Sequence, residues 1–258
     1  MERRKASIGW TEVREAWRLF RSRIGPWLGL GLVAGTVEAA LLLLYLSAIP
    51  RLGERRNELP LFAVGAVATA VGFLIAGGLV RVGLRLIRAS EFRPGLMFIS
   101  RRALGSLCVA ALGSVASYRA LSWLLSSIWP KIWIAYYAID VLAAVPFVLT
   151  IPLIADRGLG PVDAVRESLR RALPHYFGIL IAQISVYVLS LLATFPVSCL
   201  MQIAIPRAPF NPWLFGVVIL ATFAFALPFY YLAVCCIYRQ LIPYAEGEGR
   251  YFARAGAQ

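Results

Sequence analysis

Six apolar runs separated by short polar segments dominate the pattern of hydrophobic and polar positions along the chain. A helix needs about 20 apolar residues to cross the hydrocarbon core of a bilayer, and each run is long enough. The pattern predicts transmembrane helices near residues 27–49, 60–80, 103–128, 132–155, 177–205 and 213–238. We therefore expect a single all-α membrane domain over residues 1–258, a bundle of six transmembrane helices with a segment at 1–26 before it and a tail at 239–258 after it.

Positive charge is distributed unequally between the connecting segments. The chain carries 26 Lys and Arg against 13 Asp and Glu. Twenty of the cationic residues fall on the side that holds both ends of the chain, and five fall on the other side. Because cytoplasmic segments of membrane proteins are enriched in Lys and Arg, we expect both termini on the cytoplasmic side of an inner (plasma) membrane of bacterial type. The same excess favours anionic lipid headgroups over nucleic acid as partners.

Residues 10–24 show a different pattern, that of an amphipathic helix. Apolar side chains recur at helical spacing, arginines line another face, and Thr11 is placed to cap the start. This predicts an interfacial helix on the inner leaflet that contacts lipid or a partner protein. The residues expected to make the contact are Trp10, Arg14, Trp17, Arg18, Phe20 and Arg21.

Part of this segment recurs later in the chain. The sequence VREAWR at 13–18 matches VRESLR at 165–170 in four of six positions, and each copy precedes an apolar run. A basic stretch also precedes the third run. One arrangement that explains these observations is a set of three helical hairpins, each introduced by a basic cytoplasmic segment; chance similarity is the alternative.

Three charged side chains lie well inside the predicted spans: Glu38, Arg119 and Asp140. A charge near the bilayer centre costs about 2.5 to 3.5 kcal/mol, so we expect pairing. A tight turn at Pro130 places Arg119 and Asp140 at equal depth on adjacent helices, with Glu38 as a second acceptor. The cluster is either a structural ion pair or a proton, cation or substrate site. Four further side chains extend it as a polar seam: Ser114, Ser117, Gln183 and Ser185.

Motifs for catalysis and metal binding are missing from the sequence. There is no CxxC pair, no nucleophile elbow, no zinc-peptidase motif and no phosphate-binding loop. We expect no catalytic residues, no metal and no cofactor. The preferred function is a non-enzymatic accessory or assembly subunit, or a lipid-interacting scaffold, that works with partner membrane proteins or as a homo-oligomer. The alternative is a small transporter or channel built on the intramembrane cluster, and a third is a lipid enzyme with a cleft near His175 or Asp156.

Residues 151–158 (IPLIADRG), followed by Pro161, Asp163, Ala164 and Ser168, resemble a motif in a broad set of bacterial polytopic membrane proteins. These are similar to the membrane domain attached to some glycerophosphodiester phosphodiesterases. The opening, residues 17–20 (WRLF) leading into residues 25–27 (GPW), also resembles the start of that set. The resemblance implies a six-helix bundle that faces the cytoplasm. It assigns no catalysis, because the chain has no phosphodiesterase domain.

Overall fold

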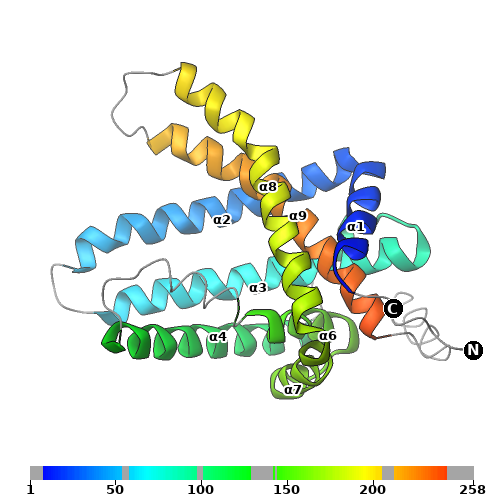
Figure 1. Ribbon diagram of the computed structural model, residues 1–258. Coiled ribbons are helices and arrows are strands. Elements are labelled where there is room, and N and C mark those ends of the chain that lie inside the picture. The colour runs from blue at the N-terminus through cyan, green and yellow to red at the C-terminus, as the bar shows by residue number, and fades with distance from the viewer. Residues whose placement is uncertain are drawn as a thin grey trace, which may run out of the picture.

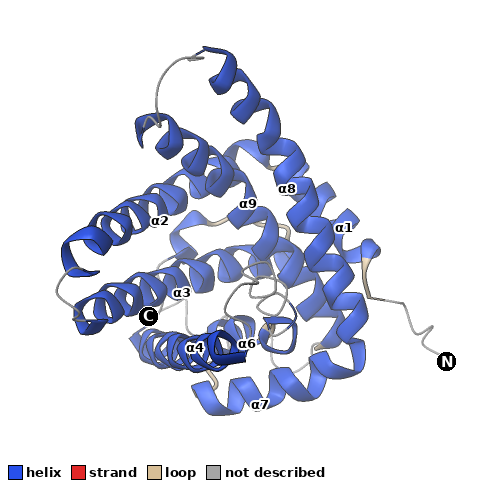
Figure 2. Ribbon diagram, turned by 60° about the vertical axis from the view of Figure 1, so that its left-hand side comes forward, coloured by secondary structure: helices blue, strands red, loops and turns tan. Residues whose placement is uncertain are grey.

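The structure is a computed structural model that describes residues 8–53, 58–97, 101–128, 142, 144–204 and 212–242. Within these ranges every regular element is a helix and none is a strand, which confirms the all-helical class (Figures 1 and 2). The α-helices are α1 (Trp10–Ser22), α2 (Ile24–Gly53), α3 (Glu58–Ala89), α4 (Arg101–Ile128), α6 (Thr150–Arg157), α7 (Pro161–Ala172), α8 (Tyr176–Ala204) and α9 (Pro212–Leu241). Three 3-10 turns join them: η1 (Pro94–Met97), η2 (Val145–Phe147) and η3 (Leu173–His175).

Within the described residues, four helical stretches are long and apolar enough to cross a membrane. They are Ile24–Leu41, Ala63–Ala89, Pro161–Ala193 and Leu220–Leu241, and α4 adds a shorter apolar stretch, Ala103–Ser117. Large apolar side chains such as Phe177, Tyr187 and Phe195 are exposed along α8. An apolar outer surface of this kind suits a helix surrounded by lipid.

Two predicted spans differ from the helices that form. The second span was expected to end at residue 80, but α3 continues to Ala89 and includes Arg81, Arg85 and Arg88. The fourth span, 132–155, is described only near its end, where the chain forms η2 and then a new helix at Thr150. Pro146 lies in η2 and has no N–H to continue an α-helical ladder. Residues 132–141 lie outside the described residues.

Two three-helix units repeat along the chain with a separation of 152 positions. The units are α1–α2–α3 and α7–α8–α9. Helices α2 and α8 begin 152 positions apart, at Ile24 and Tyr176, and α3 and α9 end 152 positions apart, at Ala89 and Leu241. The short match between residues 13–18 and 165–170 is therefore one part of a longer correspondence.

Burial follows the same spacing as the helix boundaries. Several equivalent pairs have no exposed surface in either copy, among them Phe20 and Ala172, Trp27 and Ile179, and Val80 and Leu232. The central helices α3 and α9 also meet at equivalent positions, since a Cβ added at Gly83 would lie 3.0 Å from the Sγ of Cys235. Parallel repeats related by an axis along the membrane normal are a known way to build membrane bundles.

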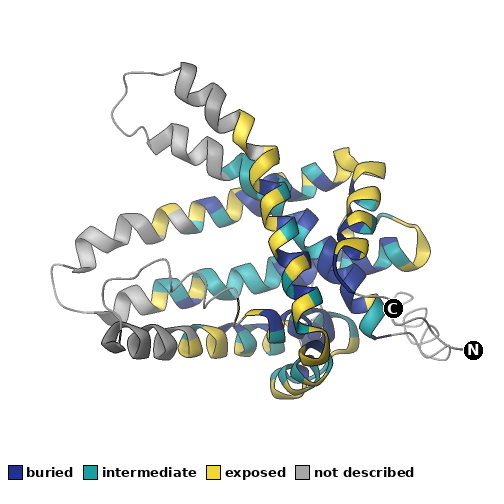
Figure 3. Ribbon diagram, in the orientation of Figure 1, coloured by how far each residue is buried: buried dark blue, intermediate teal, exposed yellow. Residues whose placement is uncertain are grey.

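The most deeply buried side chains gather at the end of the bundle where α3 and α9 finish (Figure 3). We call this end the collar and define it as α1, α6, α7, residues 79–89 of α3 and residues 229–241 of α9. In Figure 1 it lies on the right, and α2, α3 and α4 extend away from it to the left. The collar therefore contains the arginine-rich segments of α1, α3 and α7, and Arg239 of α9, together with much of the core.

Candidate functional site: the collar network

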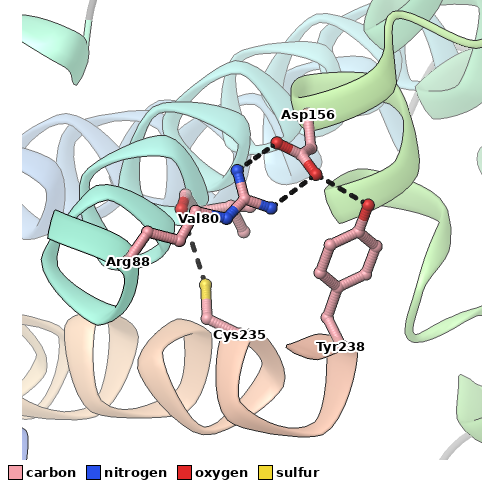
Figure 4. A network of polar contacts seen from close by, with 5 residues as sticks. All are labelled: Val80, Arg88, Asp156, Cys235 and Tyr238. Atoms are coloured by element: carbon pink, nitrogen blue, oxygen red, sulfur yellow. Dashed lines mark hydrogen bonds and ion pairs between the residues drawn. The ribbon is translucent and has the colours of Figure 1, made fainter. Parts of the chain in front are cut away.

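Asp156 is the centre of a polar network that joins three helices of the collar. Its two carboxylate oxygens accept hydrogen bonds from Arg88 of α3 at 2.7 and 2.8 Å. One of the same oxygens accepts a bond from the hydroxyl of Tyr238 of α9 at 2.8 Å (Figure 4). The Asp156 side chain is only 6% exposed and that of Arg88 is 25% exposed. The bidentate geometry and the low exposure make this a strong charge-assisted contact, and it holds α6 against α3 and α9.

The sequence around Asp156 folds into an elbow for local reasons. Helix α6 stops at Gly158, which has a φ of 64° and so occupies the left-handed region that glycine adopts without strain. Helix α7 then starts with Pro161 at its first turn, where a missing N–H costs nothing. The buried hydroxyl of Ser168 in α7 donates to the carbonyl of Pro146 and accepts from the N–H of Leu149. The α7 helix is thereby fixed to the turn that precedes α6.

Arg171 ties α7 to the end of α9. Its guanidinium pairs with Glu167 one turn earlier on α7. It also donates to the carbonyl of Leu241, the last residue of α9, at 3.0 Å. A cation at the C-terminus of a helix satisfies a carbonyl that has no partner within the helix and interacts favourably with the helix dipole.

Helix α1 is held on the other side of α9. Glu15 accepts two 2.7 Å bonds from Arg239 of α9. Phe20 is fully buried and packs edge-on against Phe225 and Phe229, at centroid separations of 5.2 and 5.8 Å. The helix begins one residue before Thr11, and the carboxylate of buried Glu12 accepts a bond from the N–H of Gly9 instead of a threonine cap.

The outer face of α1 differs from the expected separation of apolar and basic residues. Trp10 is 58% exposed and Trp17 is 40% exposed, although Trp17 still touches Phe229 edge-on. Arg14, Arg18 and Arg21 are exposed as well. Residues 10, 14, 17 and 21 follow helical spacing, so tryptophans and arginines share one face. The buried face consists of Glu12, Val13, Ala16 and Phe20.

Of the predicted intramembrane cluster, the structure describes the Glu38 side chain alone. Glu38 is partly buried in α2 and points at α3, where a Cβ added at Gly72 would lie 2.9 Å from its Oε1. Arg119 is in α4, but its side chain and the whole of Asp140 lie outside the described residues. The predicted pairing of these three charges therefore stays a prediction.

The expected polar seam consists mainly of bonds within single helices. Ser114, Ser117 and Ser185 each donate to a carbonyl three or four residues earlier on their own helix. Gln183 of α8 donates across to the hydroxyl of Tyr230 on α9 at 3.2 Å. Among these four side chains, the described bond of Gln183 is the one that joins two helices.

Sequence reasoning treated Asp156 as a motif residue and missed its partners Arg88 and Tyr238. These partners are 68 and 82 positions away from Asp156, and no local pattern pairs residues at such separations. The one available signal was the acid itself, an aspartate directly after an apolar run. His175, which the sequence also offered as a candidate, is exposed in η3.

The described residues contain no group of three or more His, Cys, Asp or Glu placed to hold a metal ion. The chain matches no family model, no curated protein and no solved structure. The geometry of its own residues is thus the basis for a functional proposal.

Proposed function

We propose that this chain is a non-enzymatic integral membrane component that works with partner proteins, as an accessory or assembly subunit with a lipid-contacting cytoplasmic platform. The observation that carries the proposal is the collar network around Asp156. It concentrates charge-assisted contacts at one end of the bundle and joins segments from the whole length of the chain. An end that is held together by these contacts and exposes arginines at its surface suits the docking of a partner protein or of a second copy of the chain.

The proposal includes six transmembrane helices in an inner membrane of bacterial type, with both termini in the cytoplasm and the collar on that side. Its support comes from charge, because α1, the end of α3, α7 and the end of α9 carry the cationic residues that the positive-inside rule assigns to the cytoplasm. The likeness of residues 151–168 to bacterial membrane proteins of the set described above agrees with this arrangement.

A small transporter or channel is the second candidate, and Glu38 is the observation that favours it. This carboxylate lies within the apolar stretch Ile24–Leu41 and is directed at a glycine of the neighbouring helix. An ionisable side chain at membrane depth is costly and often marks an ion or proton pathway. Arg119 and Asp140 would complete such a pathway if they join Glu38.

Proton and cation flux through proteoliposomes separates the two functions. We expect purified chain in phosphatidylethanolamine and phosphatidylglycerol vesicles to give the same rate of dye-reported pH equilibration as vesicles with an inert membrane protein, and Glu38→Gln to leave that rate unchanged. Cross-linking in native membranes should capture the same partner protein with the Glu38→Gln variant as with the wild-type chain. Thr36→Ala, on the same helix and with only a bond to its own helix, is the matched control. Flux well above the inert protein that disappears in Glu38→Gln alone would replace the subunit proposal with the transporter.

A further inference from the structure

The repeat makes α1 and α7 equivalent helices, and their outer faces agree position by position. Arg14 corresponds to Arg166 and Arg18 to Arg170, and all four are exposed. The residues behind them agree as well, since Ala16 and Ser168 are both fully buried. One copy of an exposed arginine pair could be incidental to a solvated surface. Two copies at the same positions of a repeat, each immediately before a long apolar helix, indicate a shared role.

Most of the acidic side chains next to these arginines are already engaged by other partners; Asp163 in the first turn of α7 is exposed and offsets one of the two arginine charges there. On α1, Glu12 bonds the N–H of Gly9 and Glu15 pairs with Arg239. On α7, Glu167 pairs most closely with Arg171, and its contact with Arg170 is long, at 3.8 Å. Both outer faces therefore present a local excess of positive charge, which is complementary to an anionic surface.

Exposed apolar side chains flank the arginines on both helices. On α1 these are Trp10 and Trp17. For α7 they are Val162 in its first turn and Leu173 directly after its end, with exposures of 77% and 52%. Tryptophan is enriched at the boundary between headgroups and acyl chains. A helix that combines such residues with arginines binds in the interfacial plane, strengthened by anionic lipid.

The direction of α1 agrees with that position. In Figure 1, α1 is turned away from the direction of α2, and it ends at a break at Arg23, where the backbone leaves helical geometry. Helix α7 is likewise separated from α8 by η3. Each amphipathic helix thus reaches its long apolar neighbour through a bend.

We propose that α1 and α7 form a duplicated binding surface for anionic phospholipids, in which Arg14 and Arg18 on α1 and Arg166 and Arg170 on α7 bind the headgroup phosphates. The planar guanidinium groups suit bidentate contact with phosphate oxygens. The flanking tryptophans of α1, together with Val162 and Leu173 at the two ends of α7, enter the outer part of the acyl layer. This inference deepens the proposed function and rests on it, because it names the lipid class that the collar contacts.

Native mass spectrometry of the purified full chain tests the surface directly. The detergent-solubilised protein is mixed with equal amounts of phosphatidylglycerol and phosphatidylcholine, and the bound lipids are counted. We expect preferential retention of phosphatidylglycerol. Each of the double variants Arg14→Gln/Arg18→Gln and Arg166→Gln/Arg170→Gln should reduce that preference about ten-fold, because each basic residue near an anionic surface contributes several-fold in affinity.

A matched control removes the same net charge elsewhere. Arg55→Gln/Arg56→Gln changes two arginines that lie between α2 and α3 in sequence, outside the segments that define the collar. This variant should keep the wild-type preference. Equal loss in all three double variants would show a general effect of net charge and overturn the proposal, as would unchanged retention in both collar variants. Loss of a cross-linked partner in the two collar variants, with their lipid preference intact, would also overturn the lipid-binding proposal. That result would leave the proposed subunit function standing.

Discussion

Asp156→Ala should lower the free energy of unfolding by about 3 kcal/mol, because it breaks a largely buried ion pair and leaves the Arg88 guanidinium without the two bonds that it donates to the carboxylate. The Tyr238 hydroxyl loses its acceptor in the same variant. Thermal unfolding in mild detergent, followed by tryptophan fluorescence and by size-exclusion recovery, measures the effect. The transition should move to a clearly lower temperature.

Two controls separate the network from general loss of charge. Glu91→Ala removes an acid whose partners Arg85 and Arg93 are well exposed, so a change of less than about 1 kcal/mol is expected. Tyr238→Phe removes a single hydrogen bond to the carboxylate and should cost about 1.5 kcal/mol. If Asp156→Ala unfolds at the same temperature as Glu91→Ala, the network does not hold the collar together.

Gly31→Ala should destabilise the protein by about 1 to 3 kcal/mol, although alanine is the better helix former. Helix α2 crosses α9 at this glycine. A Cβ there would meet the backbone carbonyl of Ala224 and lie 2.8 Å from the Cγ of Pro228. Because the backbone of α9 cannot move aside cheaply, the two helices would have to separate. The measurement is the same thermal unfolding in detergent.

Gly29→Ala is the matched control on the same helix. Gly29 is exposed, and nothing lies within 4 Å of a Cβ placed there. The substitution should therefore be neutral or should stabilise the protein by up to about 1 kcal/mol through helix propensity. The structure indicates that α2 and α9 approach each other closely at Gly31, as small residues allow in membrane bundles. Equal stability of the two variants would contradict this close approach.

Hydrophobic periodicity predicted the long helices well, because a run of apolar residues is a local property. The expected limits of α4, α8 and α9 lie within three residues of those observed. It failed at the end of α3, where arginines were taken to mark a loop. The helix continues because Arg85 and Arg88 find acids, one of them the distant Asp156, and hydropathy carries no information about such partners.

The site was harder to predict than the fold for the same physical reason. The sequence pattern drew attention to three charges inside the spans, whereas the ion pairs of Asp156, Glu167 and Glu15 lie at the collar. On α1, Trp17 borders both faces, since it lies beside Arg14 on the outer face and still touches Phe229 of the bundle. Which side of an amphipathic helix meets the bundle depends on what packs behind it, here Phe225 and Phe229.

Topology reporters test whether the collar lies at the cytoplasmic face of a six-span bundle, as we propose. Fusions of a compartment-specific enzyme after residues 95, 165 and 250 should be active only as cytoplasmic reporters, because twenty of the cationic residues lie on that side. Fusions after residues 55, 130 and 208 should report the opposite side of the membrane. Cytoplasmic activity after residue 55 or 208, or its absence after residue 95 or 165, would place the collar elsewhere and contradict the account.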